Sequence, residues 1–87
     1  MTSGLRELPR MPKSTARTLK TLGWKVQKLR KKHNMTQEEF AGQLGISRVY
    51  MGYIEQGRES PSLKLLMKIA RKLGVSLTEL FVYGISK

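Results

Sequence analysis

The sequence predicts an all-α chain, and three observations indicate this class. Apolar residues recur at three- and four-residue steps, which is the period of a helix with one buried face. Several of these segments begin just after a Ser or Thr and end at a Gly, the residue types that cap helices. No segment shows the two-residue alternation of a half-buried strand. The pattern predicts five helices in one domain.

Length and composition limit the kinds of site that the chain can build. Its 87 residues suffice for one compact domain but hardly for two. It has no Cys and a single His, so no disulfide and no metal site is expected, and nothing indicates a cofactor or a small-molecule effector. The apolar runs are short and no leader peptide is evident. We therefore expect no membrane span and a cytoplasmic protein.

The charge predicts a polyanionic partner, because a surface with a net charge of +11 accumulates anions. Residues 1–33 carry ten Lys or Arg against one Glu, whereas residues 34–87 carry seven against five Glu. The first segment is therefore +9 and the second +2. No nucleophile–base pair, carboxylate pair or phosphate-binding loop can be assembled from these residues, so an enzyme is not expected.

Residues 1–17 are expected to form a flexible basic N-terminal arm, with the folded domain over residues 18–87. The arm contains Gly4, Pro9 and Pro12 and has no apolar period. It could be a solubility tail or an arm that follows a nucleic-acid groove.

A first helix is predicted from Thr18 to about His33. Its buried stripe is Leu19, Leu22, Val26 and Leu29, spaced by three or four residues. Much of the remaining surface is basic, which fits either a solvated face or phosphate attraction. Trp24 falls off the stripe, so it is expected either at an interface or against the N-terminal segment.

The next two helices are short and close together. Thr36 and Glu39 form a capping-box pattern, and Gly45 is suited to end the helix that follows. Ser47 is a good cap for a third helix, from Arg48 to about Gln56. The residues expected to be buried are Phe40, Ala41, Leu44, Met51 and Ile54. Those expected to face outward on the third helix are Arg48, Val49, Gly52 and Tyr53.

Two further helices complete the domain. Gly57 closes the third helix, and Ser60 is predicted to cap the fourth, with Pro61 at its first position. The expected inner face of the fourth helix is Leu63, Leu66, Met67, Ala70 and Leu73. Gly74 should end it, and Ser76 with Glu79 repeats the capping-box spacing. The short fifth helix contains Leu77, Leu80 and Phe81.

The second and third helices have the features of a helix-turn-helix. Two short helices joined by a tight Gly turn can cross at a large angle, so that the second projects and fits a DNA major groove about 12 Å wide. Ala41 is small where the two helices approach each other, and Gly45 makes the turn.

A spaced pattern from Leu19 to Phe81 resembles the Cro and phage-repressor type of helix-turn-helix domain. That family includes xenobiotic-response regulators and restriction-modification controller proteins, and it implies a five-helix lambda-repressor-like fold. The residues that carry the resemblance are Leu22-Gly23, Val26, Leu29-Arg30, Met35 to Ala41, Leu44 to Ser47, Ile54 to Gly57, Pro61-Ser62, Leu66, Ile69-Ala70, Leu73 to Val75 and Leu80-Phe81.

The resemblance also implies roles for single residues. Base edges would be read by Arg48, Val49 and Tyr53. The DNA backbone would be contacted by Gln37, Ser47, Tyr50 and Arg58. Arg30 and Glu55 would form a structural ion pair between the first helix and the end of the third.

These expectations lead to two possible functions, DNA binding and protein binding. The first is a homodimeric, sequence-specific transcriptional regulator, such as a repressor, on a double-stranded DNA operator with symmetric half-sites. The dimer surface would be the fifth helix and tail, where Phe81, Val82, Tyr83 and Ile85 exceed what a short terminal helix can bury alone. The alternative is a protein-interaction module of antitoxin-like or coactivator-like type.

Overall fold

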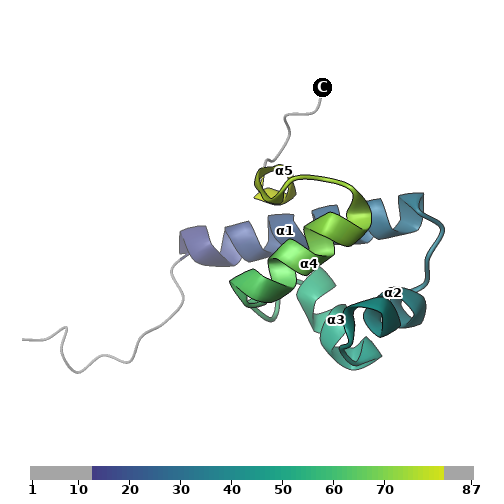
Figure 1. Cartoon of the computed structure of the whole chain (residues 1–87). Helices are drawn as coiled ribbons and strands as arrows, with labels where there is room; N and C mark the ends of the chain where they lie inside the picture. The colour runs from purple at the N-terminus through teal and green to yellow at the C-terminus, as the bar shows by residue number, and fades with distance from the viewer. Residues whose placement is uncertain (1–12, 82–87) are drawn as a thin grey trace, which may run out of the picture.

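The computed structural model describes residues 13–81 and consists there of five helices without strands (Figure 1). The helices are α1 Lys13–Lys32, α2 Gln37–Leu44, α3 Arg48–Glu55, α4 Leu63–Leu73 and α5 Leu77–Phe81. None of the helices in the described part is long and apolar enough to cross a bilayer. The predicted all-α class is confirmed.

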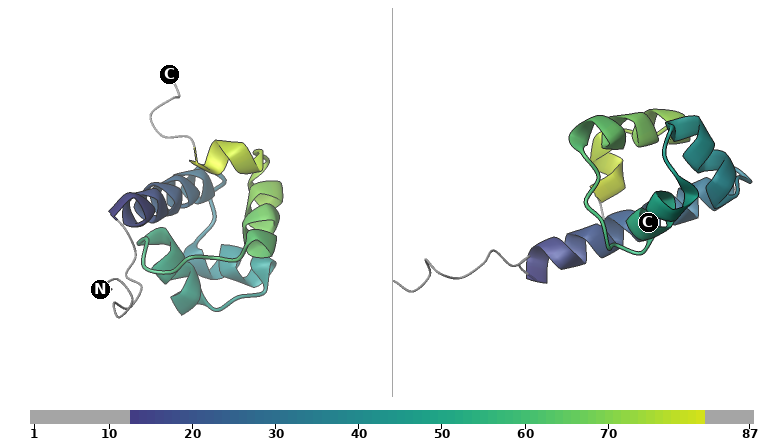
Figure 2. Two further views of the ribbon diagram at one scale, coloured as in Figure 1. Left: turned by 90° about the vertical axis from the view of Figure 1, so that its left-hand side faces the viewer. Right: turned by 90° about the horizontal axis from the view of Figure 1, so that it is seen from below.

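The helices surround one apolar core. The long α1 runs along the bundle and contacts α3, α4 and α5, while α2 contacts α3 and α4 (Figures 1 and 2). The buried apolar side chains are Leu19, Leu22, Val26, Phe40, Ala41, Leu44, Met51, Ile54, Leu66, Ile69, Ala70, Leu73 and Leu80. The stripes predicted for α1, α2 and α3 therefore face inward, with Leu29 partly buried at the edge of the core.

Helix α1 begins earlier than predicted. It starts at Lys13 and not at Thr18, so residues 13–17, assigned to the arm, belong to the helix. Ala16 and Arg17 are compatible with a helix, and the prediction erred because this turn carries no apolar residue large enough to extend the periodic pattern. The rest of the predicted arm, residues 1–12, lies outside the described residues, as do residues 82–87 of the predicted tail.

Helix α4 differs from the prediction in its start and in its inner face. Ser62, and not Ser60, is the cap: its hydroxyl accepts from the Leu65 amide at 3.1 Å. Pro61 is buried ahead of the helix and is not its first residue. The inner face is Leu66, Ile69, Ala70 and Leu73, whereas Leu63 and Met67 are exposed.

Helix α5 begins with the predicted capping box. The Glu79 carboxylate accepts from the Ser76 amide at 2.8 Å, and the Ser76 hydroxyl accepts from the Glu79 amide at 3.1 Å. Leu80 enters the core, while Phe81 at the end of the helix remains partly exposed. The predicted box is confirmed, and it orients the last described helix against α1.

A glycine sets the distance between α1 and α3. A Cβ added at Gly23 would lie 2.5 Å from the Glu55 carbonyl oxygen and 2.8 Å from its carbon, distances that real Cβ atoms do not adopt. The obstacle is backbone, so it cannot be relieved by a change of rotamer. Gly23 therefore allows the C-terminal end of α3 to lie directly on α1.

Candidate nucleic-acid interface

The α2–α3 pair has the turn that the sequence predicts. The Thr36 hydroxyl accepts from the Glu39 amide at 3.0 Å, and the Glu39 carboxylate accepts from the Thr36 amide at 2.9 Å, so the predicted capping box starts α2. Gly45 ends α2 in the left-handed conformation, with φ of 75°. Ser47 then caps α3, leaving only two residues between the glycine and α3. This short connection fixes α3 relative to α2.

Helix α3 buries one side and exposes the other. Met51 and Ile54 are buried in the core, while Arg48 and Val49 are exposed, the latter with 52% of its surface accessible. The exposed pair lies in the first turn of α3. The beginning of the helix is thus the part whose side chains are free to reach a partner.

Gly52 is buried, which corrects the prediction that it faces outward. The side chains nearest to its Cβ position belong to Gln37 and Gln56, at 3.8 to 3.9 Å. An added methyl would make ordinary van der Waals contacts there. The space above Gly52 is therefore filled by neighbouring glutamines of this chain.

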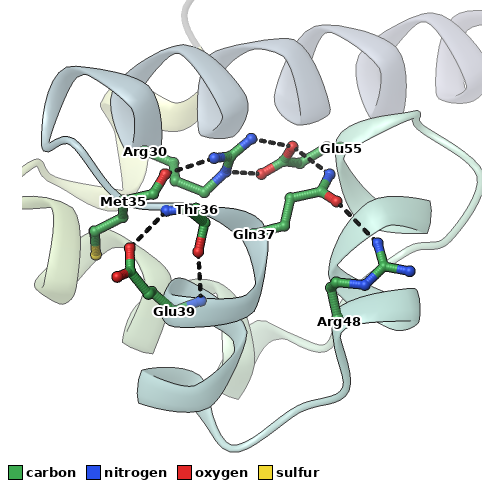
Figure 3. A network of polar contacts seen from close by, with 7 residues as sticks. All are labelled: Arg30, Met35, Thr36, Gln37, Glu39, Arg48 and Glu55. Atoms are coloured by element: carbon green, nitrogen blue, oxygen red, sulfur yellow. Dashed lines mark hydrogen bonds and ion pairs between the residues drawn. The ribbon is translucent and has the colours of Figure 1, made fainter.

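An ion pair anchors α3 to α1. The Arg30 Nε donates to Glu55 Oε2 at 2.6 Å, and Arg30 Nη2 donates to Glu55 Oε1 at 3.0 Å (Figure 3). Both residues are buried. The third guanidinium nitrogen, Nη1, donates to the Met35 carbonyl at 2.6 Å, just before α2. One guanidinium therefore joins α1, the α1–α2 connection and α3.

Gln37 extends this pair to the surface. Its Nε2 donates to Glu55 Oε1 at 3.0 Å, and its Oε1 accepts from Arg48 Nη1 at 3.4 Å (Figure 3). A chain of hydrogen bonds thus runs from buried Arg30 through Glu55 and Gln37 to exposed Arg48. We call these four residues the polar chain. It links the exposed Arg48 side chain, through Gln37, to the buried ion pair.

The other predicted contact residues lie around the same helix. The Ser47 hydroxyl accepts from the Tyr50 amide at 3.0 Å, so its own hydrogen remains available for donation. Tyr50 and Tyr53 are both partly buried, and Tyr50 packs against the core. Beyond α3, the Arg58 guanidinium lies 4.6 Å from the centre of the Tyr53 ring and donates to Gln56 at 3.3 Å.

Gly57 places Arg58 beside α1. It has φ of 77°, and an added Cβ would lie 2.8 Å from both Cα and Cγ of Lys20. A side chain at this position would therefore be strained and would also clash. The connection after α3 consequently lies flat against the N-terminal half of α1.

Sequence reasoning missed two features of the site. The bridging role of Gln37 was not predicted, because it depends on partners 11 and 18 residues away along the chain. Gly23 was named among the residues that carry the family resemblance, but its close contact with α3 was not predicted. Its signal was available, since a Gly inside a helix costs about 1 kcal/mol relative to Ala and often marks a close approach.

The arrangement defines a class of protein. Two helices joined by a short Gly-bounded turn, the second exposing its first turn, form a helix-turn-helix domain. A model of the helix-turn-helix family HTH_3 matches residues 26–80. An uncharacterised HTH-type transcriptional regulator of Methanocaldococcus jannaschii is 46% identical over 59 residues, which cover 68% of this chain and 89% of the relative. The chain belongs to this family of DNA-binding transcriptional regulators, of the Cro/C1 type.

Solved structures confirm the lambda-repressor-like fold. The restriction-modification controller protein C.AhdI from Aeromonas hydrophila has a TM-score of 0.68 and 33% identity, covering 72% of this chain and 96% of that protein. SinR, described as the master regulator for biofilm formation and solved in complex with DNA, has a TM-score of 0.65 and 27% identity. That match covers 70% of this chain and 98% of the SinR chain.

Proposed function

We propose that this chain is a homodimeric transcriptional regulator that binds a double-stranded DNA operator with symmetric half-sites and reads it with α3. The observation that carries the proposal is Arg48, exposed in the first turn of α3 and oriented through Gln37 by a buried ion pair. An arginine fixed in this way suits guanine, whose O6 and N7 it can contact at once.

Base reading in this proposal uses one side of α3. Arg48 contacts guanine, and Val49, exposed beside it, packs on a thymine methyl group. Tyr53, one turn further on, contributes its ring edge or hydroxyl. Because Arg58 covers the Tyr53 ring in the free protein, that contact requires the two side chains to separate or to meet DNA together.

Backbone contacts in this proposal come from four residues around α3: Gln37, Ser47, Tyr50 and Arg58. Ser47 and Gln37 stand at the first turns of α3 and α2, where helix dipoles also favour phosphate. Gln37 has a second amide hydrogen beyond the one given to Glu55, so it can donate to phosphate without leaving the polar chain. These contacts position the domain without reading sequence.

A homodimer is supported by exposed apolar side chains on α4 and α5. Leu63 and Met67 on α4 are exposed, and so is Phe81 on α5. Apolar side chains of this size gain free energy when a second copy covers them. A two-fold dimer would set two α3 helices about 34 Å apart, one turn of DNA.

Selection from random double-stranded oligonucleotides tests this proposal. The full-length protein is expected to enrich a two-fold symmetric motif with half-sites about 10 base pairs apart. Affinity for that motif should fall by roughly 10³–10⁵ between about 50 and 200 mM salt, as expected for 6–10 phosphate contacts. Sedimentation in the presence of the selected DNA should give two chains per duplex. Recovery of no motif would contradict the proposal and favour a protein-interaction module instead.

A further inference from the structure

The outer side of α1 carries a cationic stripe centred on a tryptophan. The side chains that share this side, at spacings of three, four and seven residues, are Arg17, Lys20, Trp24, Lys28 and Lys31. All five are exposed. We call them the Trp24 face. It lies opposite the stripe of α1 that enters the core.

The charge of this face is not compensated within its helix. Helix α1 holds eight Lys or Arg and no Asp or Glu. Lys28 and Lys31 are three residues apart on the same side, a spacing at which like charges destabilise a helix. A bound polyanion would remove this repulsion, so the face favours an acidic partner.

Trp24 adds an apolar surface at the centre of the charge. It is 48% exposed, and the Lys28 ammonium lies 4.8 Å from the centre of its ring. The ammonium covers part of the ring by a cation–π contact, which orders both side chains. The remaining ring surface is available to an apolar group, and tryptophan is enriched where protein partners meet.

Most of the Trp24 face lies away from α3, although Lys20 at its edge lies against Gly57, next to Arg58. Gly23 directs its Cβ position at the backbone of Ile54 and Glu55, and each residue of a helix turns by about 100° from the one before it. Trp24 is therefore rotated away from α3. Figure 2 (left) shows α1 near one corner of the bundle with α2 and α3 below it. DNA that contacts α3 and Arg58 would come nearest to Lys20 and would leave Trp24 and Lys28, further round α1, uncovered.

We propose that the Trp24 face docks an acidic segment of another protein, one in which carboxylates flank apolar side chains. Charge complementarity selects this partner: carboxylates meet Arg17, Lys20, Lys28 and Lys31, and an apolar side chain packs on Trp24. Pairing of this face with the same face of a second copy is disfavoured, because the basic side chains of two α1 helices would be brought together. The outside of a DNA duplex offers phosphates but little apolar surface for the ring.

Trp24 is the only tryptophan, so its emission reports on this face directly. The probe is a random copolymer of glutamate and leucine added to the full-length protein. Polyglutamate, which has carboxylates but no apolar side chains, is the control. The copolymer is expected to shift Trp24 emission to shorter wavelength as the ring loses water. Polyglutamate should bind more weakly and give a smaller shift.

Two variants that change the net charge equally distinguish binding at the Trp24 face from attraction to the net charge of the protein. Lys28→Glu should weaken copolymer binding about tenfold more than Lys72→Glu, which alters an exposed lysine in the last turn of α4. Circular dichroism checks that both variants fold. On the selected DNA, the two variants should lose affinity equally.

Other results would overturn the proposal. Equal copolymer binding by the two variants would mean attraction to the net charge alone. A larger loss of DNA affinity for Lys28→Glu than for Lys72→Glu would make the face a DNA contact. An emission shift caused by vesicles of anionic lipid and not by the copolymer would indicate a membrane surface, and self-association that buries Trp24 would indicate a second copy.

Discussion

Two arginines at opposite ends of α3 have different surroundings. Arg48, in its first turn, bonds to Gln37 and through it to the buried Arg30–Glu55 pair. Arg58, just beyond the last turn, lies over the partly buried Tyr53 and bonds to the exposed Gln56. Arg48 is thus linked to the core through one hydrogen bond to Gln37, whereas Arg58 is held by Tyr53 and Gln56 alone. This difference fits the two roles that we propose, a base contact for Arg48 and a DNA-backbone contact for Arg58.

The largest effect is expected from breaking the buried end of the polar chain. Glu55→Ala should lower the free energy of unfolding by about 3–5 kcal/mol, because the Arg30 guanidinium would stay buried without its carboxylate. Urea unfolding measures the loss. Glu59→Ala removes an exposed carboxylate and should change stability by less than about 0.5 kcal/mol. Equal losses in the two variants would show that the pair does not anchor α3.

Two glycine-to-alanine variants test the contact between α1 and the end of α3. Gly23→Ala should destabilise the fold by about 1–3 kcal/mol or more, because the new Cβ meets backbone of α3 that cannot move aside. Gly42→Ala, inside α2 with nothing within 4 Å of its Cβ position, should instead stabilise by about 0.5–1 kcal/mol. Thermal unfolding compares them. A shift of the same sign in both would remove Gly23 from the account of how α3 is positioned.

A smaller effect is expected from the middle of the polar chain. Gln37→Ala should lower stability by only about 0.5–1.5 kcal/mol, since Glu55 keeps both bonds to Arg30. It should also reduce the ratio of affinity for the selected motif over random DNA, because Arg48 loses its orienting partner. Anisotropy titrations measure both affinities, and Gln43→Ala, an exposed glutamine of the same helix, is the control. An unchanged ratio would mean that Gln37 contacts phosphate alone.

Much of this fold was predictable because its signals are local. The Thr36–Glu39 and Ser76–Glu79 boxes and the glycine end at Gly45 depend on residues within a few positions of each other. Such contacts form in any chain with that spacing. The helix boundaries built on them agree with the structure to within a residue or two.

The start and inner face of α4 were not predictable in the same way. Ser60 and Ser62 flank Pro61, and either serine can cap a helix by its type alone. Apolar residues also occupy more than half of α4, so periodicity does not decide which of them are buried. The packing of α4 against α1, α2 and α5 buries Ile69 and leaves Met67 exposed.

The Arg30–Glu55 pair and the exposure of Arg48 and Val49 were predictable, but the link between them through Gln37 was not. Arg48 and Val49 follow directly from the turn and the cap that precede them. The link from Glu55 to Gln37 joins residues 18 positions apart and requires α2 and α3 to be packed together. Gly52 was assigned to the surface by helix periodicity, but the side chains of Gln37 and Gln56 cover it. Periodicity describes one helix and says nothing of what neighbours place upon it.

We expect Arg48 to read the base sequence and Arg58 to contact DNA without reading it, and one comparison of variants distinguishes these roles. Affinities of Arg48→Ala and Arg58→Ala are compared on the selected motif and on random DNA at one salt concentration. Arg48→Ala should lose about 1–3 kcal/mol of binding free energy on the motif and little on random DNA. Arg58→Ala should weaken binding to both alike. Equal losses on motif and random DNA for Arg48→Ala would contradict the account.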